Sequence, residues 1–131
     1  MTPLPRDASE HQHQVALFDW AAMMSRVHPD LGLLYAIPNT AKRSMRQGRR
    51  MKDEGLRPGM PDICLPVARG DYSALYIELK ARGGRLRDSQ RDRLRELFDA
   101  GNAAWVAIGW EQAADLLVKY LRESLEGAGG W

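Results

Sequence analysis

The segment ALYIELK, residues 74–80, follows the turn GMPD, residues 59–62, and these two stretches decide the fold of this chain. If residues 74–80 form a strand, side chains alternate between its two faces. The leucines and the isoleucine then face one way, while Tyr76, Glu78 and Lys80 face the other. A carboxylate and an ammonium are costly to bury without partners. The strand therefore predicts a charged site on its polar face.

Asp62, at the end of the turn, suggests that this site binds a hard divalent cation. Mg²⁺ prefers oxygen ligands, keeps several waters, and usually takes one or two carboxylates together with substrate phosphates. Asp62 and Glu78 could supply the carboxylates, and Lys80 could hold a water or a phosphate oxygen. Two alternatives stay open: Asp62 caps the turn, and Glu78 with Lys80 forms an exposed ion pair on the wet face of a sheet.

The chain has 131 residues, which suits one domain with one core. We predict a single domain over residues 1–131, with its core at about 9–122 and tails at 1–8 and 126–131. No stretch approaches the roughly 20 apolar residues that span a membrane. The N-terminus lacks the apolar run of a signal peptide, and the single cysteine, Cys64, excludes a disulfide framework. These features favour a cytoplasmic location.

The net charge of +2 conceals two basic clusters that flank the acidic pair in the sequence. The first cluster is Lys42, Arg43, Arg46, Arg49, Arg50 and Lys52, and the second is Arg82, Arg85, Arg87, Arg91, Arg93 and Arg95. Arginines that hold phosphates, beside carboxylates that hold a metal, favour a polyanionic substrate. The alternative for either cluster alone is a solvated helix face.

Apolar periodicity and capping residues predict four helices and four strands. The helices are expected at about 9–26, 40–54, 88–100 and 110–125, and the strands at 33–37, 62–66, 74–80 and 103–108. Ser9 is the expected N-cap of the first helix, and Asp88 or Ser89 that of the third. The second helix is polar almost all round, so we expect it to be exposed.

This order, α-β-α-β-β-α-β-α, predicts an α/β fold with a mixed central sheet flanked by helices. The strand at 33–37 is expected to be short and buried. Residues 127–131 are expected to form a loose tail, with Trp131 either disordered or docked on a partner subunit.

Several motifs together resemble those of a known nuclease family. Pro61-Asp62 with Glu78-x-Lys80 is similar to the site of the PD-(D/E)xK nucleases, which have the restriction-endonuclease-like fold. The wider set resembles the virus-type replication-repair nuclease (VRR-NUC) family: SEHxxQ at 9–14, IPN at 37–39, GxxPGxPD at 55–62, IELK at 77–80 and SQ at 89–90. The resemblance runs from about residue 9 to 120. One departure is TAKR at 40–43, where family members often have a glycine before the arginine.

The resemblance implies a role for each matching residue. The implied metal ligands are Glu10, Asp62, Glu78 and the backbone carbonyl of Leu79, and the implied catalytic residues are Asp62, Glu78, Lys80 and Gln90. Lys80 would orient or help activate the attacking water, and Gln90 would assist it. The implied cofactor is Mg²⁺, with Mn²⁺ as a substitute. Alternatives are that Glu10 is a first-turn acid favoured by the helix dipole, and that Gln90 is a surface residue.

The resemblance further implies a Mg²⁺-dependent, structure-selective DNA endonuclease similar to Holliday-junction resolvases. Its substrate would be branched DNA, its assembly a homodimer, and its setting the cytoplasm of a bacterial or phage-infected cell. The expected DNA contacts are Lys42, Arg43, Arg46, Arg49, Arg50, Arg82, Arg85 and Arg87. Alternatives are a non-catalytic nucleic-acid-binding module and a nuclease subunit that requires a partner. A zinc site is disfavoured, because His11 and His13 lie two residues apart and point to different sides of a helix.

Overall fold

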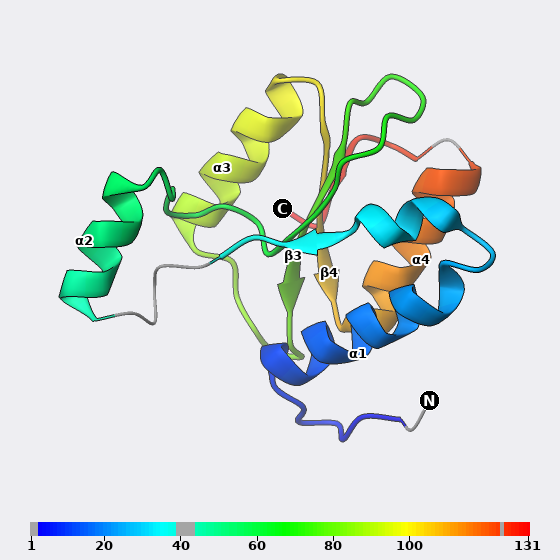
Figure 1. Cartoon of the computed structure of the whole chain (residues 1–131), viewed down its shortest axis with the longest axis horizontal. Helices are drawn as coiled ribbons and strands as arrows, with labels where there is room; N and C mark the ends of the chain where they lie inside the picture. Colours follow the sequence, from blue (N-terminus) through cyan, green and yellow to red (C-terminus); the bar gives the residue numbers. More distant parts are fainter. Residues whose placement is uncertain (1–2, 39–43, 124) are drawn as a thin grey trace.

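The computed structural model describes residues 3–38, 44–123 and 125–131 of the chain. Its helices are α1 (Glu10–Met24), the 3₁₀ helix η1 (Pro29–Leu33), α2 (Met45–Asp53), α3 (Asp88–Asp99) and α4 (Trp110–Arg122). Its strands are β1 (Tyr35–Ala36), β2 (Ile63–Leu65), β3 (Leu75–Lys80), β4 (Ala103–Ile108) and β5 (Ala128–Gly129). The strands form one mixed sheet with helices around it (Figure 1). The expected α/β fold with a mixed central sheet is confirmed.

The strand order across the sheet is β1-β2-β3-β4-β5, which places β3 at the centre. β2 pairs antiparallel with β1 and β3, whereas β4 pairs parallel with β3 and β5. A parallel pair needs a crossover connection, and α3 provides it between β3 and β4. Lys80 lies in register with Ile108, so both strands end at the same edge of the sheet.

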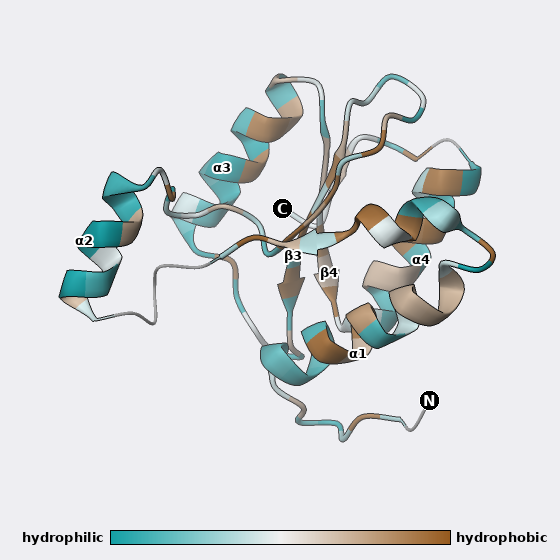
Figure 2. Cartoon of the chain, in the orientation of Figure 1, coloured by the Kyte–Doolittle hydropathy of each residue, from teal (hydrophilic) through white to brown (hydrophobic). Residues whose placement is uncertain are grey.

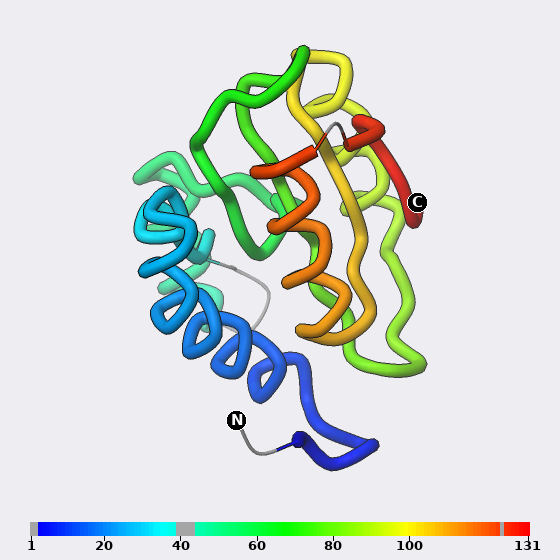
Figure 3. Tube along the Cα trace, turned by 90° about the vertical axis from the view of Figure 1, so that its right-hand side faces the viewer, coloured from blue at the N-terminus to red at the C-terminus, as the bar shows by residue number. Residues whose placement is uncertain are grey.

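Helices cover both faces of the sheet, and each face has its own apolar core (Figure 3). On the larger face, α1 and α4 bury their apolar side chains against β3, where Leu75, Ile77 and Leu79 are almost fully inaccessible. Tyr120 closes this core, and its hydroxyl donates a hydrogen bond to the Val67 carbonyl at 2.6 Å. On the other face Leu94 of α3 packs on β4. The polar side of β3 therefore faces α3.

The first helix begins as expected, with Ser9 as its N-cap. The Gln12 amide donates to Ser9 Oγ at 3.1 Å, and the Ser9 amide donates to Gln12 Oε1 at 2.9 Å. Glutamine thus completes the capping box as glutamate would. This cap fixes where α1 starts, and so where Glu10 stands.

The buried strand expected at 33–37 is wrong. A 3₁₀ turn takes up Pro29–Leu33, because proline suits the first position of a helical turn. What remains is β1, which lies at the sheet edge with both residues exposed. An edge strand has a neighbouring strand on one side only, so the apolar residues at 33–37 do not by themselves make β1 buried.

The second helix, expected at 40–54, is described from Met45 onward, and residues 40–43 lie outside the described part of the chain. Ser44 is its N-cap, because a second capping box joins Ser44 to Gln47. Lys42 and Arg43 lie outside the described residues. The expected exposure is confirmed, since no residue of α2 is buried. Figure 2 shows that α2 is mostly hydrophilic and stands away from the sheet.

Two expectations for the second half of the chain also need correction. The N-cap of α3 is Arg87 rather than Asp88 or Ser89, because Gln90 accepts a hydrogen bond from the Arg87 amide at 2.9 Å. The tail is not loose: β5 pairs with β4, and Trp131 Nε1 donates to the Ala104 carbonyl at 2.8 Å. A Cβ at Gly129 would collide with the Trp105 ring, so glycine is what admits this close approach.

Trp131→Ala is expected to lower the free energy of unfolding by about 2 kcal/mol. The indole packs edge-on against Phe98, with 6.4 Å between ring centroids, and the substitution removes both this contact and the hydrogen bond to Ala104. Urea unfolding measures the difference. Trp131→Phe keeps the packing, so its free energy of unfolding should lie between those of wild type and Trp131→Ala. An unchanged midpoint for Trp131→Ala would contradict a packed C-terminus.

Candidate active site

Asp62 is fixed against the central strand by the turn that precedes β2. Its Oδ2 accepts a hydrogen bond from the Leu79 amide at 2.8 Å. Gly59, with φ +76°, lets this turn pass close to the start of α3, since a Cβ there would stand 2.6 Å from the Ser89 carbonyl oxygen. The glycine of the turn and the serine of the third helix are thus neighbours in space. The structure therefore brings the GxPD and SQ motifs together next to β3.

Glu78 and Lys80 are buried, with 1% and 6% of their surface exposed. Gln90 joins them: its Nε2 donates to Glu78 Oε1 at 3.0 Å, and its Oε1 accepts from Lys80 Nζ at 3.1 Å. Lys80 Nζ is also 3.6 Å from Glu78 Oε1. The alternative of an exposed ion pair is therefore wrong. The alternative that Gln90 is only a surface residue is also wrong, because from the first turn of α3 it bonds to both side chains.

The second carboxylate oxygen of Glu78, Oε2, has no hydrogen-bond partner among the described residues. Burial, and then the neighbouring Asp62 carboxylate, raise the pKa of Glu78 to about 9, although Lys80 opposes the shift. Without a cation, Glu78 therefore holds a proton at neutral pH. A buried, unpartnered oxygen beside a second carboxylate fits a divalent cation, because the cation would take the place of that proton.

Glu10 reaches this site from the first turn of α1, by way of Lys80. Its Oε1 lies 3.9 Å from Lys80 Nζ, and about half of its side chain is exposed. Within the described part of the chain, no three His, Cys, Asp or Glu side chains already stand at metal-ligand spacing. Asp62 and Glu78 thus form the more closely associated pair, while Glu10 contacts Lys80 from α1. Leu79 contributes its amide to Asp62 and its side chain to the core.

The arginines expected to bind DNA occupy two exposed places. Arg46, Arg49 and Arg50 line a surface pocket of about 380 Å³ on α2. Arg50 also pairs with Glu54 at 3.2 Å, both largely exposed. The others, Arg82, Arg85 and Arg87, are exposed on the loop that leads from β3 to α3. This loop leaves the sheet directly after Lys80, so its arginines border the charged site.

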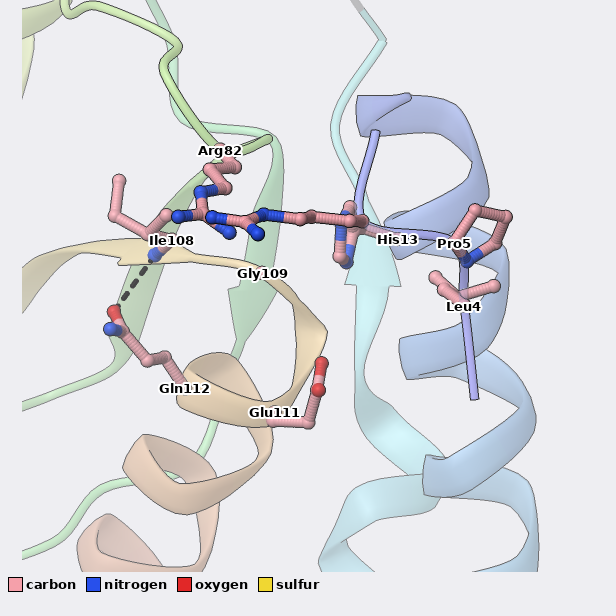
Figure 4. A pocket seen from close by; sticks show the side chains of 9 residues that line it. Leu4, Pro5, His13, Arg82, Ile108, Gly109, Glu111 and Gln112 are labelled. Carbon is pink, nitrogen blue, oxygen red and sulfur yellow. Dashed lines mark hydrogen bonds between the residues drawn. The ribbon is translucent and has the colours of Figure 1, made fainter. Parts of the chain in front are cut away.

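Arg6 and His13 lie near this site, although sequence reasoning had given neither a role. With Arg82 they line a pocket of about 490 Å³, and Figure 4 shows His13 and Arg82 on different segments around it. The Trp110 amide donates to His13 Nδ1 at 3.1 Å, which ties α1 to the start of α4. No local pattern could have indicated this, because Arg6 precedes the first helix and Arg82 is far away in sequence.

Comparison with known proteins agrees with these features. The family model described as the VRR-NUC domain matches residues 6–109, which include the carboxylates, Lys80 and Gln90. A solved structure described as a VRR_NUC domain protein superposes with a TM-score of 0.72 at 21% sequence identity. The match covers 95% of this chain and 98% of that one. A search of curated proteins found no match.

The described residues contain no helix of sufficient length and apolarity to cross a membrane.

The family is one of nuclease domains, which act on DNA. Its model covers most of the chain, and the similar structure has the same fold over nearly the whole length. The chain therefore belongs to the VRR-NUC domain family.

Proposed function

We propose that the protein is a Mg²⁺-dependent, structure-selective DNA endonuclease that cleaves branched DNA as a homodimer, as Holliday-junction resolvases do. The observation that carries this proposal is the buried pair of Glu78 and Lys80, joined through Gln90 beside Asp62. Taking a carboxylate and an ammonium out of water costs several kcal/mol per charge unless the pairing is very good. DNA binding alone would gain nothing from that cost, and acids next to phosphates would weaken it.

Asp62 and Glu78 would hold the Mg²⁺, and Glu10 would be a further acidic ligand. The unpartnered Oε2 of Glu78 supports this assignment. When bound, Mg²⁺ lowers the pKa of a coordinated water and neutralises charge that develops on the phosphate. Mn²⁺ has similar ligand preferences and is expected to substitute for it.

Lys80 would orient the attacking water and neutralise charge at the scissile phosphate. Lysine suits this task because its ammonium is a compact point charge with several donors. Lys80 Nζ donates a hydrogen bond to Gln90 Oε1 at 3.1 Å, and this bond fixes the position of the ammonium. In-line attack at the phosphorus would leave a 3′-hydroxyl and a 5′-phosphate.

Shape rather than base sequence is the expected determinant of substrate choice. The arginines of α2 and of the loop after β3 would hold phosphates, and phosphate contacts carry no direct sequence information. A four-way junction offers two symmetric strands, which suits paired cleavage by a two-fold dimer. The apolar face of α4 is not a candidate dimer interface, because it is buried in the core of its own domain.

Replacing Arg46 and Arg49 with alanine is expected to weaken junction binding and to flatten its salt dependence. Each lost phosphate contact should reduce the slope of log K against log salt by about 0.9 on duplex DNA. Fluorescence anisotropy in EDTA at several salt concentrations measures both. Arg26→Ala is the matched control, because Arg26 is an exposed arginine just beyond the C-terminal end of α1. An unchanged slope in the double variant would remove α2 from the DNA interface.

Cleavage of labelled four-way junction, flap and linear duplex DNA tests the function itself. Each substrate is incubated with Mg²⁺ and with EDTA, beside the Lys80→Ala variant. Paired, Mg²⁺-dependent nicks in the junction alone, absent from the variant, would support the proposal, and light scattering gives the assembly state. Tight binding without cutting would instead indicate a non-catalytic binding module or a subunit that requires a partner.

A further inference from the structure

We infer that the 490 Å³ pocket beside the charged site is a subsite for one nucleotide that flanks the scissile phosphate. Its walls come from the segment before α1, from α1 itself, from the loop after β3, and from the start of α4 (Figure 4). This inference rests on the proposed nuclease function and adds a position where the DNA strand is held. The pocket's charge, its donors, its apolar wall and its location each support it.

The charge of the pocket favours an anion. Arg6 and Arg82 both line it, and among the described residues no ion pair joins either guanidinium to a carboxylate. Glu111 is the one acid in the lining, so the pocket is net positive. Two guanidiniums from distant parts of the chain repel each other unless an anion lies between them. A phosphate is the anion that guanidiniums bind best, through paired N–H donors.

Two side chains in the lining have donors that their own hydrogen bonds set in place. His13 Nδ1 accepts from the Trp110 amide at 3.1 Å, so the donor of the ring is Nε2. Gln112 Oε1 accepts from the Ile108 amide at 2.9 Å, which leaves its NH₂ group to donate (Figure 4). Donors fixed in this way lose little freedom when they bind an oxygen.

The pocket also has an apolar wall, which a phosphate alone would not require. Leu4, Pro5 and Ile108 line it, and Ile108 is 42% exposed although it ends a central strand. The volume lies within the range of about 300–1,000 Å³ that is usual for pockets binding small organic ligands. A nucleotide satisfies both features, because its phosphate can meet the arginines while its sugar and base cover the apolar wall.

The location links this pocket to the scissile phosphate. The Gly109 amide donates to the Lys80 carbonyl at 2.8 Å, so the pocket borders the end of the catalytic strand. Arg82 follows Lys80 by two residues, a span of at most about 7 Å of extended chain. His13 lies one turn along α1 from Glu10. One DNA strand can therefore reach both Lys80 and the pocket.

Arg6→Ala and Arg82→Ala test the subsite in EDTA, where binding is separated from cleavage. Each variant is expected to bind the four-way junction about 10-fold more weakly than wild type, with a flatter salt slope. Arg26→Ala is the matched control and should match wild type. Circular dichroism and the urea midpoint should be unchanged, because Arg82 is exposed and Arg6 lies in an exposed turn. Wild-type affinity in both variants would overturn the inference.

A second arm identifies which phosphate is bound. Junctions are made with one neutral methylphosphonate linkage at successive positions around the cleavage site. At one flanking linkage the substitution should weaken wild-type binding about 10-fold, yet have no further effect on Arg6→Ala. If instead the methylphosphonate weakened binding by the same factor in wild type and in Arg6→Ala at every linkage, Arg6 would contact none of these phosphates, and the inference would be overturned.

Failure of the subsite can be told apart from failure of the nuclease proposal. Mg²⁺-dependent cutting that Lys80→Ala abolishes would stand even if Arg6 and Arg82 proved dispensable for binding. Thymidine monophosphate tests the other source of the same chemistry. If it binds the Arg26→Ala control and not Arg6→Ala, yet does not compete with the junction, the pocket takes a free nucleotide instead of a strand, which overturns the inference.

Discussion

Lys80→Met is expected to reduce the rate of DNA cleavage by about 10²–10⁴-fold, the usual contribution of a positioned catalytic group. Methionine is also a long, unbranched side chain, but it has no ammonium. In the wild type that ammonium lies 3.1 Å from Gln90 Oε1 and 3.6 Å from Glu78 Oε1, and it is nearly sealed from solvent. Its removal would take away the group that we propose orients the attacking water and offsets part of the phosphate charge. The loss should therefore fall on the chemical step.

Single-turnover cleavage of the junction in Mg²⁺, set beside anisotropy in EDTA, separates that loss from binding. Affinity should change by no more than a few-fold, because one buried charge contributes little to the DNA-binding surface. Lys119→Met is the matched control, since Lys119 is an exposed lysine on α4. If Lys80→Met cut within a few-fold of wild type, the role assigned to Lys80 would be untenable.

Gln90→Ala separates the function of Lys80 from its position, because it leaves both charges but removes the group that joins them. The amide is the partner of both Glu78 and Lys80. Without it, the two charged side chains lose their fixed geometry rather than their chemistry. Under the proposed function Gln90 is thus a positioning residue, and it forms one hydrogen-bonded unit with Glu78 and Lys80.

The central part of the site could be predicted from sequence because it depends on short-range patterns. Strand alternation in residues 74–80 gave the faces of β3, and GMPD gave the turn before β2. Both features are local, and the structure brings Asp62, Glu78 and Lys80 together on that basis. Even the Ser9 cap depends only on neighbours three residues apart.

The parts that sequence reasoning missed depend on contacts between distant residues. Trp131 bonds to Ala104 where Gly129 lies against Trp105, and no local propensity reveals these contacts. The exposure of β1 follows from its place at the sheet edge, which strand pattern alone does not give. Arg6 and Arg82 come together only through the packing of the segment before α1 on the end of the sheet. Tertiary contacts, not propensities, set these features.

Glu78→Gln is expected to stabilise the metal-free protein while it abolishes cleavage. The pKa of Glu78 is raised from 4.5 to about 9, so the folded state keeps a proton that the unfolded state releases in between. Wild-type stability is therefore full below about pH 4.5 and falls as the pH rises to about 9. Glutamine is neutral throughout and escapes this loss. At pH 7, which is 2.5 units above the ordinary pKa, the gain in EDTA should be about 3 kcal/mol.

Urea unfolding of both proteins from pH 4 to pH 9 measures this gain, which should be near zero at the acid end and grow with pH. Millimolar Mg²⁺ should then cancel most of this gain at pH 7, because a bound cation stabilises the wild type by about 2.7 kcal/mol at 100 times its dissociation constant. Glu78→Gln has lost one of the two closely associated carboxylates and should respond little. A pH-independent difference would mean that Glu78 is ionised in the folded protein, and an equal response to Mg²⁺ would place the cation elsewhere. Under the proposed function, the fold keeps a buried acid that destabilises the metal-free protein because that acid binds the cation.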